Sequence, residues 1–220
     1  MLKFDASYSN GDSGGKLWVF WKDEIQINFL QESNQHITFI INSSLLISAV
    51  YAKCNYMERR QLWDGLLSFG VLQMPWMLIG DFNTIRHDGE RRGGCPRLPM
   101  AMEEFSSFIQ HGGLIEVPFS GNKLSWCNGR GGLTRSWARL DRALCNTRLL
   151  DSWSTISLKY LPRNSSDHAP MSLRLESSNT RYGPSIFRFQ QMWTLHEGLG
   201  GLFKIFGRRR WKELVCGTCL

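Results

Sequence analysis

The sequence has no long apolar run. Its longest apolar stretches, such as Leu45 to Ala52 with Ser48 inside it, are far shorter than the roughly 20 residues that a transmembrane helix needs. The first 15 residues are polar and rich in glycine and serine, and they contain no apolar signal core. We therefore expect a protein that is neither secreted nor embedded in a membrane and that resides inside the cell.

Cysteine is also scarce. The six cysteines are scattered over 220 residues, and without a signal peptide this usage indicates a reducing compartment rather than a disulfide framework. Cys216 and Cys219 form a single CxxC pair, whereas a structural zinc site needs four ligands, so we expect no structural zinc. The sequence contains no internal repeat and no low-complexity tract.

Acidic residues are outnumbered by basic ones. Asp and Glu total 19 against 26 Lys and Arg, which gives a formal net charge of +7 and a pI near 9.3. A basic surface suits a polyanion such as nucleic acid, although such a charge can also serve solubility alone. Hydrophobic residues make up 42% and charged residues 20%, which indicates a globular chain rather than a disordered one.

Short runs rich in Ile, Phe, Trp and Val dominate the first part of the chain. Each run is bounded by Asp, Asn, Ser or Gln, which is typical of strands joined by hairpins. We predict a turn at Asn42 to Ser44. We also predict four consecutive antiparallel strands, at Leu17 to Trp21, Ile25 to Leu30, Ile37 to Ile41 and Leu45 to Ala52.

The apolar period then changes to that of a helix. Leu62, Trp63 and Leu66 predict a helix that ends near Gly70, and a second helix around Phe105 is stopped by Gly112 and Gly113. Strands are expected afterwards, with a polar loop at 84–99 and a short helix at 146–152 between them. The expected strands are Trp76 to Ile79, Leu114 to Val117, Lys123 to Cys127, Ser136 to Ala143, Thr155 to Leu161 and Ala169 to Leu175. Many strands with few helices favour an α/β sandwich of two sheets with helices outside.

Three parts of the chain differ in composition. We predict a loose lead-in without a strand at 1–13, a folded domain at 14–176, and a linker with a basic, disordered tail at 177–220. The tail contains the run Arg208 to Arg210.

Three polar clusters follow predicted strands, where loops commonly build active sites. The first is Asp81 with Asn83, the second is Asp141, and the third is Asp167 with His168. Each cluster alone is weak, because Asp and Asn are ordinary turn formers. Together they supply carboxylates, an amide and an imidazole, a set that can bind a divalent cation, activate water and stabilise a phosphoryl transition state.

The motifs that contain these clusters, in this order, resemble those of the endonuclease/exonuclease/phosphatase superfamily, which has the deoxyribonuclease-I-like fold. The sequence is most similar to the endonuclease domain of plant non-LTR (LINE-type) retrotransposons. The resemblance covers about residues 14 to 193 and implies a four-layer α/β sandwich. The motifs that carry it are Gly80-Asp81-Phe82-Asn83, Arg139-Leu140-Asp141-Arg142, Ser166-Asp167-His168-Ala169-Pro170, Gly14 to Trp21, Ala49 to Ala52, Leu124 to Trp126 and Phe187 to Trp193.

The resemblance implies a role for each matching residue. Asp81 would orient or deprotonate the attacking water, and Asn83 would hold that water or a phosphate oxygen. His168 would contact the scissile phosphate, and Asp141 would hydrogen-bond His168 and fix its tautomer.

The resemblance also implies a metal ion and further phosphate contacts. Asp167 would contribute to a Mg²⁺ site, and Tyr51 would contact phosphate. The implied reaction is Mg²⁺-dependent hydrolysis of a phosphodiester that nicks DNA, carried out by a monomer in the nucleus. Four arginines flank the candidate site and either contact DNA phosphates or serve as soluble loop charges, namely Arg86, Arg91, Arg92 and Arg97.

The sequence departs from the family pattern at its start. The family opens with two strands before the Gly14-to-Trp21 segment, and the second ends in a glutamate that is its principal metal ligand. Gln31 and Glu32 follow Trp21, on the wrong side of the strand order, and do not replace it. We therefore expect a sandwich that lacks the first two strands and has weak or absent catalysis. The alternatives are a non-catalytic nucleic-acid-binding remnant and a phosphatase or phosphodiesterase of the same superfamily that acts on small molecules.

Overall fold

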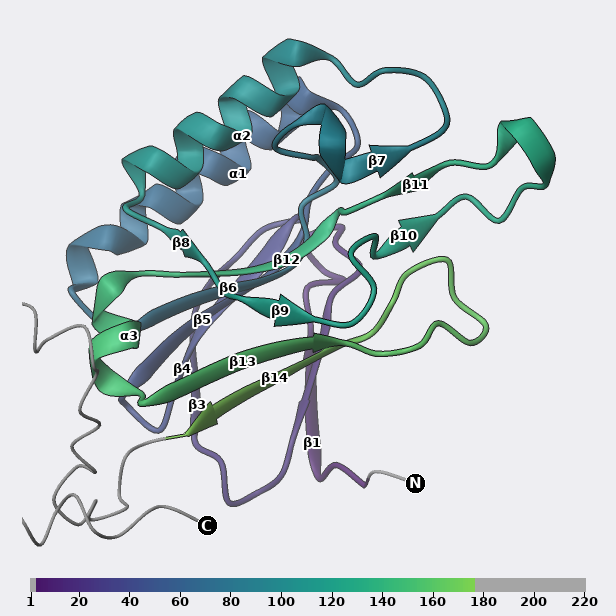
Figure 1. Cartoon of the computed structure of the whole chain (residues 1–220). Helices are drawn as coiled ribbons and strands as arrows, with labels where there is room; N and C mark the ends of the chain where they lie inside the picture. The colour runs from purple at the N-terminus through teal and green to yellow at the C-terminus, as the bar shows by residue number, and fades with distance from the viewer. Residues whose placement is uncertain (1–2, 177–220) are drawn as a thin grey trace, which may run out of the picture. The chain divides into compact units, whose positions relative to one another are not determined.

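A computed structural model describes residues 3–176 of the chain (Figure 1). The described residues belong to one compact unit, Met1–Asn179. The predicted basic tail and its CxxC pair lie outside the described residues. In the described part, no helix is long and apolar enough to cross a bilayer.

A six-stranded sheet forms the centre of the unit, in the order β3-β4-β5-β6-β12-β8. Neighbouring strands are antiparallel except β5 and β6, which run parallel and are connected through α1. The strands are β3 (Ile27–Glu32), β4 (His36–Ile41), β5 (Leu45–Tyr51), β6 (Trp76–Asp81), β8 (Ile115–Glu116) and β12 (Asp141–Cys145).

The predicted turn at Asn42 to Ser44 is confirmed. Asn42 and Ser43 both have positive φ, 47° and 55°, and the Ser44 amide donates to the Ile41 carbonyl at 3.0 Å. Two positive-φ residues between antiparallel strands twist the hairpin in the direction that the strands require. The hairpin therefore holds β4 and β5 in register.

The N-terminal segment corrects two predictions. The lead-in contains a strand, β1 (Ala6–Ser9), which pairs antiparallel with β2 (Trp18–Trp21) in a two-stranded sheet of its own. β2 therefore does not pair with β3 as the first of four consecutive strands. Sequence pattern missed β1 because Ala6–Ser9 has no apolar run. β1 pairs with β2 through the backbone, and Tyr8 connects it to β3 by stacking on Phe29, with ring centroids 3.9 Å apart.

Two helices cover one face of the six-stranded sheet, α1 (Tyr56–Leu67) and α2 (Pro99–His111) (Figure 1). Both match the predicted helices. Asn55 caps α1 by accepting from the Met57 amide, and Pro99 begins α2, where its missing N–H costs no hydrogen bond. The buried cluster beneath them includes Leu78 and Leu144 of the sheet.

A second sheet packs against the opposite face. It has the order β14-β13-β9, formed by β14 (Met171–Glu176), β13 (Thr155–Tyr160) and β9 (Phe119–Ser120). Its apolar side chains share a buried cluster with Met77 and Ala143. Met77 and Leu78 are consecutive, so the two-residue period of β6 sends one to each layer.

The remaining elements are short. A third sheet joins β10 (Trp126–Cys127), β11 (Trp137–Ala138) and β7 (Arg91–Arg92). The helix α3 (Thr147–Ser152) and the 3₁₀ turns at Ser68–Leu72, Asp88–Glu90 and Gly132–Thr134 complete the described chain. The predicted mixed α/β sandwich of two sheets is thus confirmed. Residues 3–176 form three layers of it, namely α1 with α2, the six-stranded sheet and the three-stranded β14-β13-β9 sheet.

Candidate active site

The first candidate cluster sits at the end of β6. Gly80 has φ of 145°, and a Cβ there would lie 2.0 Å from the Val50 carbonyl oxygen, so β5 and β6 can approach closely only with glycine at this position. Asp81 follows with 8% of its surface exposed. Its Oδ1 accepts the Asn83 amide at 2.8 Å, and Asn83 takes a positive φ of 50°. Asparagine tolerates this left-handed conformation better than most residues.

The second and third clusters meet the first across the sheet. Asp141 stands directly opposite Asp81 in the β6–β12 register. His168 lies in the loop before β14, and its Nδ1 is 2.9 Å from Asp141 Oδ2 and 3.1 Å from Oδ1. The predicted hydrogen bond between Asp141 and His168 is therefore present. The other ring nitrogen, Nε2, is 3.9 Å from Asp81 Oδ2.

Ser125 holds this arrangement together. Its Oγ accepts the amides of Leu140 and Asp141, at 3.0 and 3.1 Å, and its carbonyl accepts the Ala169 amide at 2.7 Å. One buried serine thus fixes both the strand that carries Asp141 and the loop that carries His168. Ser125 belongs to the Leu124-to-Trp126 motif, but the sequence assigned it no role, because a serine in a strand carries no signal of its distant partners.

Burial and neighbouring charges shift the pKa values of Asp81 and His168. Desolvation, followed by the nearby Asp141 charge, raises the pKa of Asp81 to about 6. Burial opposes the charged form of His168, but the hydrogen bond that His168 donates to Asp141 and the surrounding carboxylates outweigh it, so the pKa of His168 is raised. At neutral pH, Asp81 is therefore poised to accept a proton, and the raised pKa of His168 extends its cationic form to higher pH than in a free histidine.

Asn83 and Tyr51 lie beside this cluster. The Asn83 side-chain amide donates to the Ala52 carbonyl at 2.7 Å and so joins the end of β6 to the end of β5. Tyr51 stands opposite Asp81 in the parallel register and is exposed. The structure therefore brings together five of the predicted residues, namely Tyr51, Asp81, Asn83, Asp141 and His168.

Asp167 occupies a different position. Its Oδ2 accepts the Trp126 indole N–H at 3.1 Å, and its carbonyl accepts the Cys127 amide at 3.0 Å. Among the described residues, the group whose ligand atoms lie within 4.8 Å of one another is Asp81, Asp141 and His168. The predicted metal ligand is thus outside this group.

The donor set fits a divalent cation. Asp81 and Asp141 supply carboxylate oxygens, the ligand type that Mg²⁺ prefers. A cation would also offset the repulsion between these two buried carboxylates. Asp81 accepts the Asn83 amide, and its Oδ2 lies 3.9 Å from His168 Nε2. His168 offers less, because its Nδ1 is engaged by Asp141.

The four predicted arginines fall into two pairs with different surroundings. Arg86 lies 3.5 Å from Glu116, and Arg91 forms an ion pair with Asp88. Arg92 and Arg97 are exposed. Arg92 also lines an open groove of about 700 Å³. The other residues around this groove are Gly93, Asn122, Leu124, Gly132, Leu133, Arg135 and Trp137.

A buried ion-pair cluster behind the site was not predicted. Arg142 is fully buried and donates to Glu90 Oε1 at 3.0 Å and to Glu116 Oε1 at 2.8 Å, and Arg139 pairs with both glutamates. Glu90 also accepts the Arg86 amide at 2.8 Å. The signal for it was a pair of arginines, Arg139 and Arg142, within the predicted strand Ser136 to Ala143.

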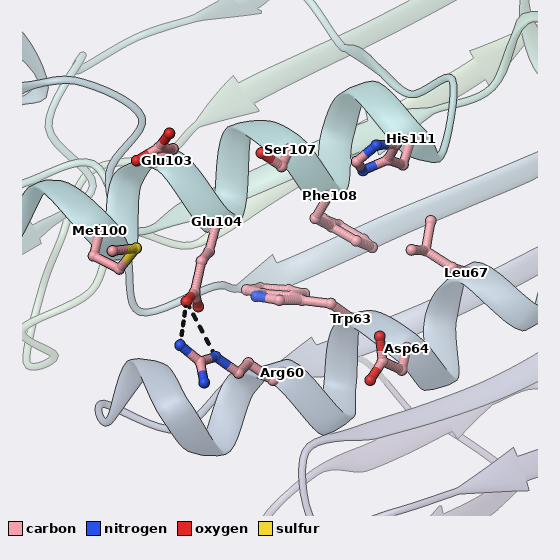
Figure 2. Close-up of a pocket in the computed structure, with 10 residues that line it drawn as sticks. All are labelled: Arg60, Trp63, Asp64, Leu67, Met100, Glu103, Glu104, Ser107, Phe108 and His111. Carbon is pink, nitrogen blue, oxygen red and sulfur yellow. Dashed lines mark hydrogen bonds and ion pairs between the residues drawn. The ribbon is translucent and has the colours of Figure 1, made fainter.

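A separate hollow of about 490 Å³ lies between α1 and α2 (Figure 2). Figure 2 shows Arg60 of α1 reaching Glu104 of α2, with Trp63 and Phe108 forming the floor. None of the candidate catalytic residues lines this hollow, so it is distinct from the site at the sheet edge.

Comparison with known proteins agrees with this architecture. The model of the Endonuclease/Exonuclease/phosphatase family matches residues 3–168. A search of curated proteins finds no match. The endonuclease domain of TRAS1, a telomere-specific non-LTR retrotransposon, superposes with a TM-score of 0.58 at 14% identity, over 72% of each chain.

Two further structures share the fold. The 3′-5′ exonuclease NExo from Neisseria meningitidis has a TM-score of 0.54 at 16% identity, over 72% of this chain and 74% of that one. A Neisseria NExo described as a 3′ phosphatase bound to product DNA hairpin has a TM-score of 0.53 at 14% identity, with the same coverage. At these identities the likeness concerns the fold.

Proposed function

The chain belongs to the endonuclease/exonuclease/phosphatase family, and from that membership we propose that it derives from a retrotransposon endonuclease whose site hydrolyses a phosphodiester bond of DNA with a divalent cation. The observation that carries the proposal is the convergence of Asp81, Asp141 and His168, from three separate parts of the chain, at one sheet edge.

Each residue has a chemical task in this reaction. Asp81, with a pKa of about 6, accepts a proton from the attacking water. His168 donates a hydrogen bond from Nε2 to a phosphate oxygen and stabilises the charge that develops there. Asp141 holds His168 through Nδ1, which leaves Nε2 facing the substrate.

Asp81 and Asp141 would hold a divalent cation through their carboxylate oxygens. When bound, it supplies Lewis-acid stabilisation of the phosphoryl oxygens. The described residues offer only these two carboxylates to the group, and one of them is shared with His168. We therefore expect weak cation binding and slow catalysis.

A DNA substrate is supported by charge and by resemblance. The chain carries a net charge of +7, and Arg92 and Arg97 are exposed. The sequence motifs resemble LINE-type endonuclease domains, and the fold is similar to that of the TRAS1 endonuclease domain.

The proposal is tested by a supercoiled-plasmid nicking assay with Mg²⁺, with and without EDTA. We expect nicking that requires Mg²⁺ and falls by at least about 100-fold in Asp81→Ala and His168→Ala. Arg60→Gln, which changes an exposed charge outside the site, serves as the matched control. Nicking that persists in both active-site variants would show a contaminating nuclease and overturn the assignment.

The weak cation group favours a second candidate, a nucleic-acid-binding protein without catalysis. Folded protein that binds duplex DNA but does not nick it, at any Mg²⁺ concentration up to about 50 mM, would support this candidate. Hydrolysis of small phosphate esters without nicking would instead indicate a small-molecule phosphatase or phosphodiesterase of the same family.

A further inference from the structure

A small pocket adjoins the candidate active site on the side of β5. Its volume is about 190 Å³, which is smaller than the roughly 300–1,000 Å³ of pockets that enclose whole small molecules. It therefore suits a single compact group. Its walls come from the loop before β2, the β3–β4 turn and the ends of β5 and β6, and the lining residues are Gly14, Lys16, Asn34, Tyr51, Ala52, Lys53, Cys54 and Asn83.

The lining of this pocket is cationic. Lys16 and Lys53 contribute two ammonium groups, and no carboxylate lines the pocket. Among the ion pairs of the described residues, neither lysine has a carboxylate within 4.0 Å. Tyr51 and Asn34 add a hydroxyl and an amide that can donate hydrogen bonds. Two unpaired cations beside neutral donors favour a compact anion.

The walls of the pocket are held by buried polar contacts. Asn10 is fully buried, accepts the Leu17 amide at 2.8 Å and donates to the Ser33 carbonyl at 2.6 Å, so it fixes the loop that carries Lys16 against the β3–β4 turn. On the other side, the Lys53 amide donates to the buried Gln35 side chain at 2.8 Å. The two lysines therefore start from fixed backbone positions.

The pocket shares residues with the candidate active site. Asn83, in its wall, donates its backbone amide to Asp81 at 2.8 Å, and Tyr51 stands opposite Asp81 in the strand register. An anion in the pocket would thus lie next to a phosphate held by His168. Along a nucleic-acid strand, the next anion is the neighbouring phosphate of the backbone.

We propose that Lys16 and Lys53 form a subsite for the phosphate adjacent to the scissile one, so that the protein binds polynucleotide strands more tightly than isolated phosphate esters. This inference rests on the proposed function for its catalytic meaning. The binding of the strand itself does not require catalysis and can be measured without it.

The first experiment measures binding in EDTA. Fluorescence anisotropy with a labelled duplex oligonucleotide compares the unmodified protein with Lys16→Gln, Lys53→Gln and the double variant. The control is Lys159→Gln, which makes the same charge change at an exposed position on β13. We expect each pocket variant to lose about 5- to 10-fold in affinity and the double variant more. The slope of log K against log salt should fall by about one per lost phosphate contact.

The second experiment measures cleavage of two substrates. In the pocket variants, KM for the oligonucleotide should rise while kcat stays within about twofold. Turnover of bis(p-nitrophenyl) phosphate, which has no neighbouring phosphate, should not change. Inorganic phosphate should compete with the oligonucleotide only weakly, because a free anion lacks the connected strand; strong competition that disappears in the pocket variants would indicate a free-phosphate site and overturn the strand assignment.

The outcomes separate the two proposals. If the protein cuts nothing but the pocket variants lose affinity and salt slope, the catalytic proposal fails and the subsite stands. If Lys16→Gln and Lys53→Gln bind like Lys159→Gln, the subsite is wrong whatever the catalytic result.

Discussion

Asp141 and Arg142 are neighbours on β12, and both are buried, yet they lie in opposite electrostatic surroundings. Arg142 meets Glu90 and Glu116, which are held in turn by Arg139, so its charge is matched by partners within the fold. Asp141 faces a second carboxylate, Asp81, across the strand pair, and its partner of opposite polarity is the His168 imidazole, 2.9 Å away. The two-residue period of a strand separates these environments within one step of the chain.

The two regions differ in what they contribute: the ion pairs around Arg142 stabilise the fold, and the carboxylates of Asp81 and Asp141 provide the reactive groups. A buried charge with several hydrogen-bonding partners of opposite sign is stable in place. Burial opposes the charged forms of Arg142 and Glu90, but their ion-pair partners outweigh it, so the pKa of Arg142 is raised and that of Glu90 is lowered. A buried carboxylate beside another carboxylate keeps part of its desolvation cost, which is why the pKa of Asp81 rises to about 6. The two adjacent carboxylates, Asp81 and Asp141, are therefore the reactive pair.

Breaking the buried ion pairs of Arg142 should have the largest effect on stability. Replacing Arg142 by Met leaves Glu90 with fewer partners in the interior, so we expect a loss of about 3–5 kcal/mol in the free energy of unfolding, measured by urea denaturation. Arg60→Gln, which removes an exposed ion pair with Glu104, should change it little. A double variant with Glu90→Gln should lose less than the sum of the two single losses; strict additivity would contradict the coupling.

Removing the charge of Asp81 should instead increase the free energy of unfolding. The folded state holds the pKa of Asp81 at about 6, above its usual value of 3.8. It therefore binds protons more tightly than the unfolded chain, and stability falls as pH rises from about 4 to 6 and stays lower above that range.

Asp81→Asn should accordingly be more stable than the unmodified protein by about 2–3 kcal/mol at pH 8 in EDTA, and no more stable at pH 4. Its catalysis should be lost. Urea denaturation at the two pH values tests this, with the exposed Asp64→Asn as a control for the charge change. Equal gains at both pH values would show that the carboxylate charge is not responsible.

A divalent cation should offset the repulsion between Asp81 and Asp141 and so stabilise the folded protein. Binding at Asp81 and Asp141 stabilises only the folded state, by about 1.4 kcal/mol at ten times the dissociation constant. We expect Mg²⁺ or Mn²⁺ to raise Tm for the unmodified protein and to leave Asp81→Asn almost unaffected, as measured by thermal scans. A rise of the same size in both proteins would place the cation elsewhere.

His36 gives the smallest expected effect and lies away from both regions. Burial lowers the pKa of His36, whose Nδ1 is 2.8 Å from the Ser33 hydroxyl while Nε2 has no hydrogen-bond partner among residues 3–176. The unfolded chain therefore takes up the proton first, and stability is lost as pH falls below about 6.5, the usual pKa of histidine. In His36→Gln, urea midpoints should depend less on pH between 7.5 and 5.5. An unchanged slope would assign that dependence to other groups.

Sequence pattern was sufficient for elements with a strong apolar period. The helices at α1 and α2, the strands β3 to β6 and the turn at Asn42 to Ser44 were all predicted, because their signals are local. β1 was missed, and the pairing of β2 was wrong, because a short polar strand is specified by its partner rather than by its own residues. The candidate site residues came from motif resemblance, and Ser125, Lys16 and Lys53 did not, since each matters only through neighbours that are distant in the sequence.

The sequence by itself determined the class of fold, the family and the residue types available for catalysis, because apolar period and motif order are written along the chain. Only the tertiary structure decided which of these residues meet. It brought Asp81, Asp141 and His168 together. It also hydrogen-bonded Asp167 to the Trp126 indole and paired Arg142 with two glutamates. The reason is physical: the energy of a charge depends on its burial and on the charges around it, and both are set by segments that the chain brings together only on folding.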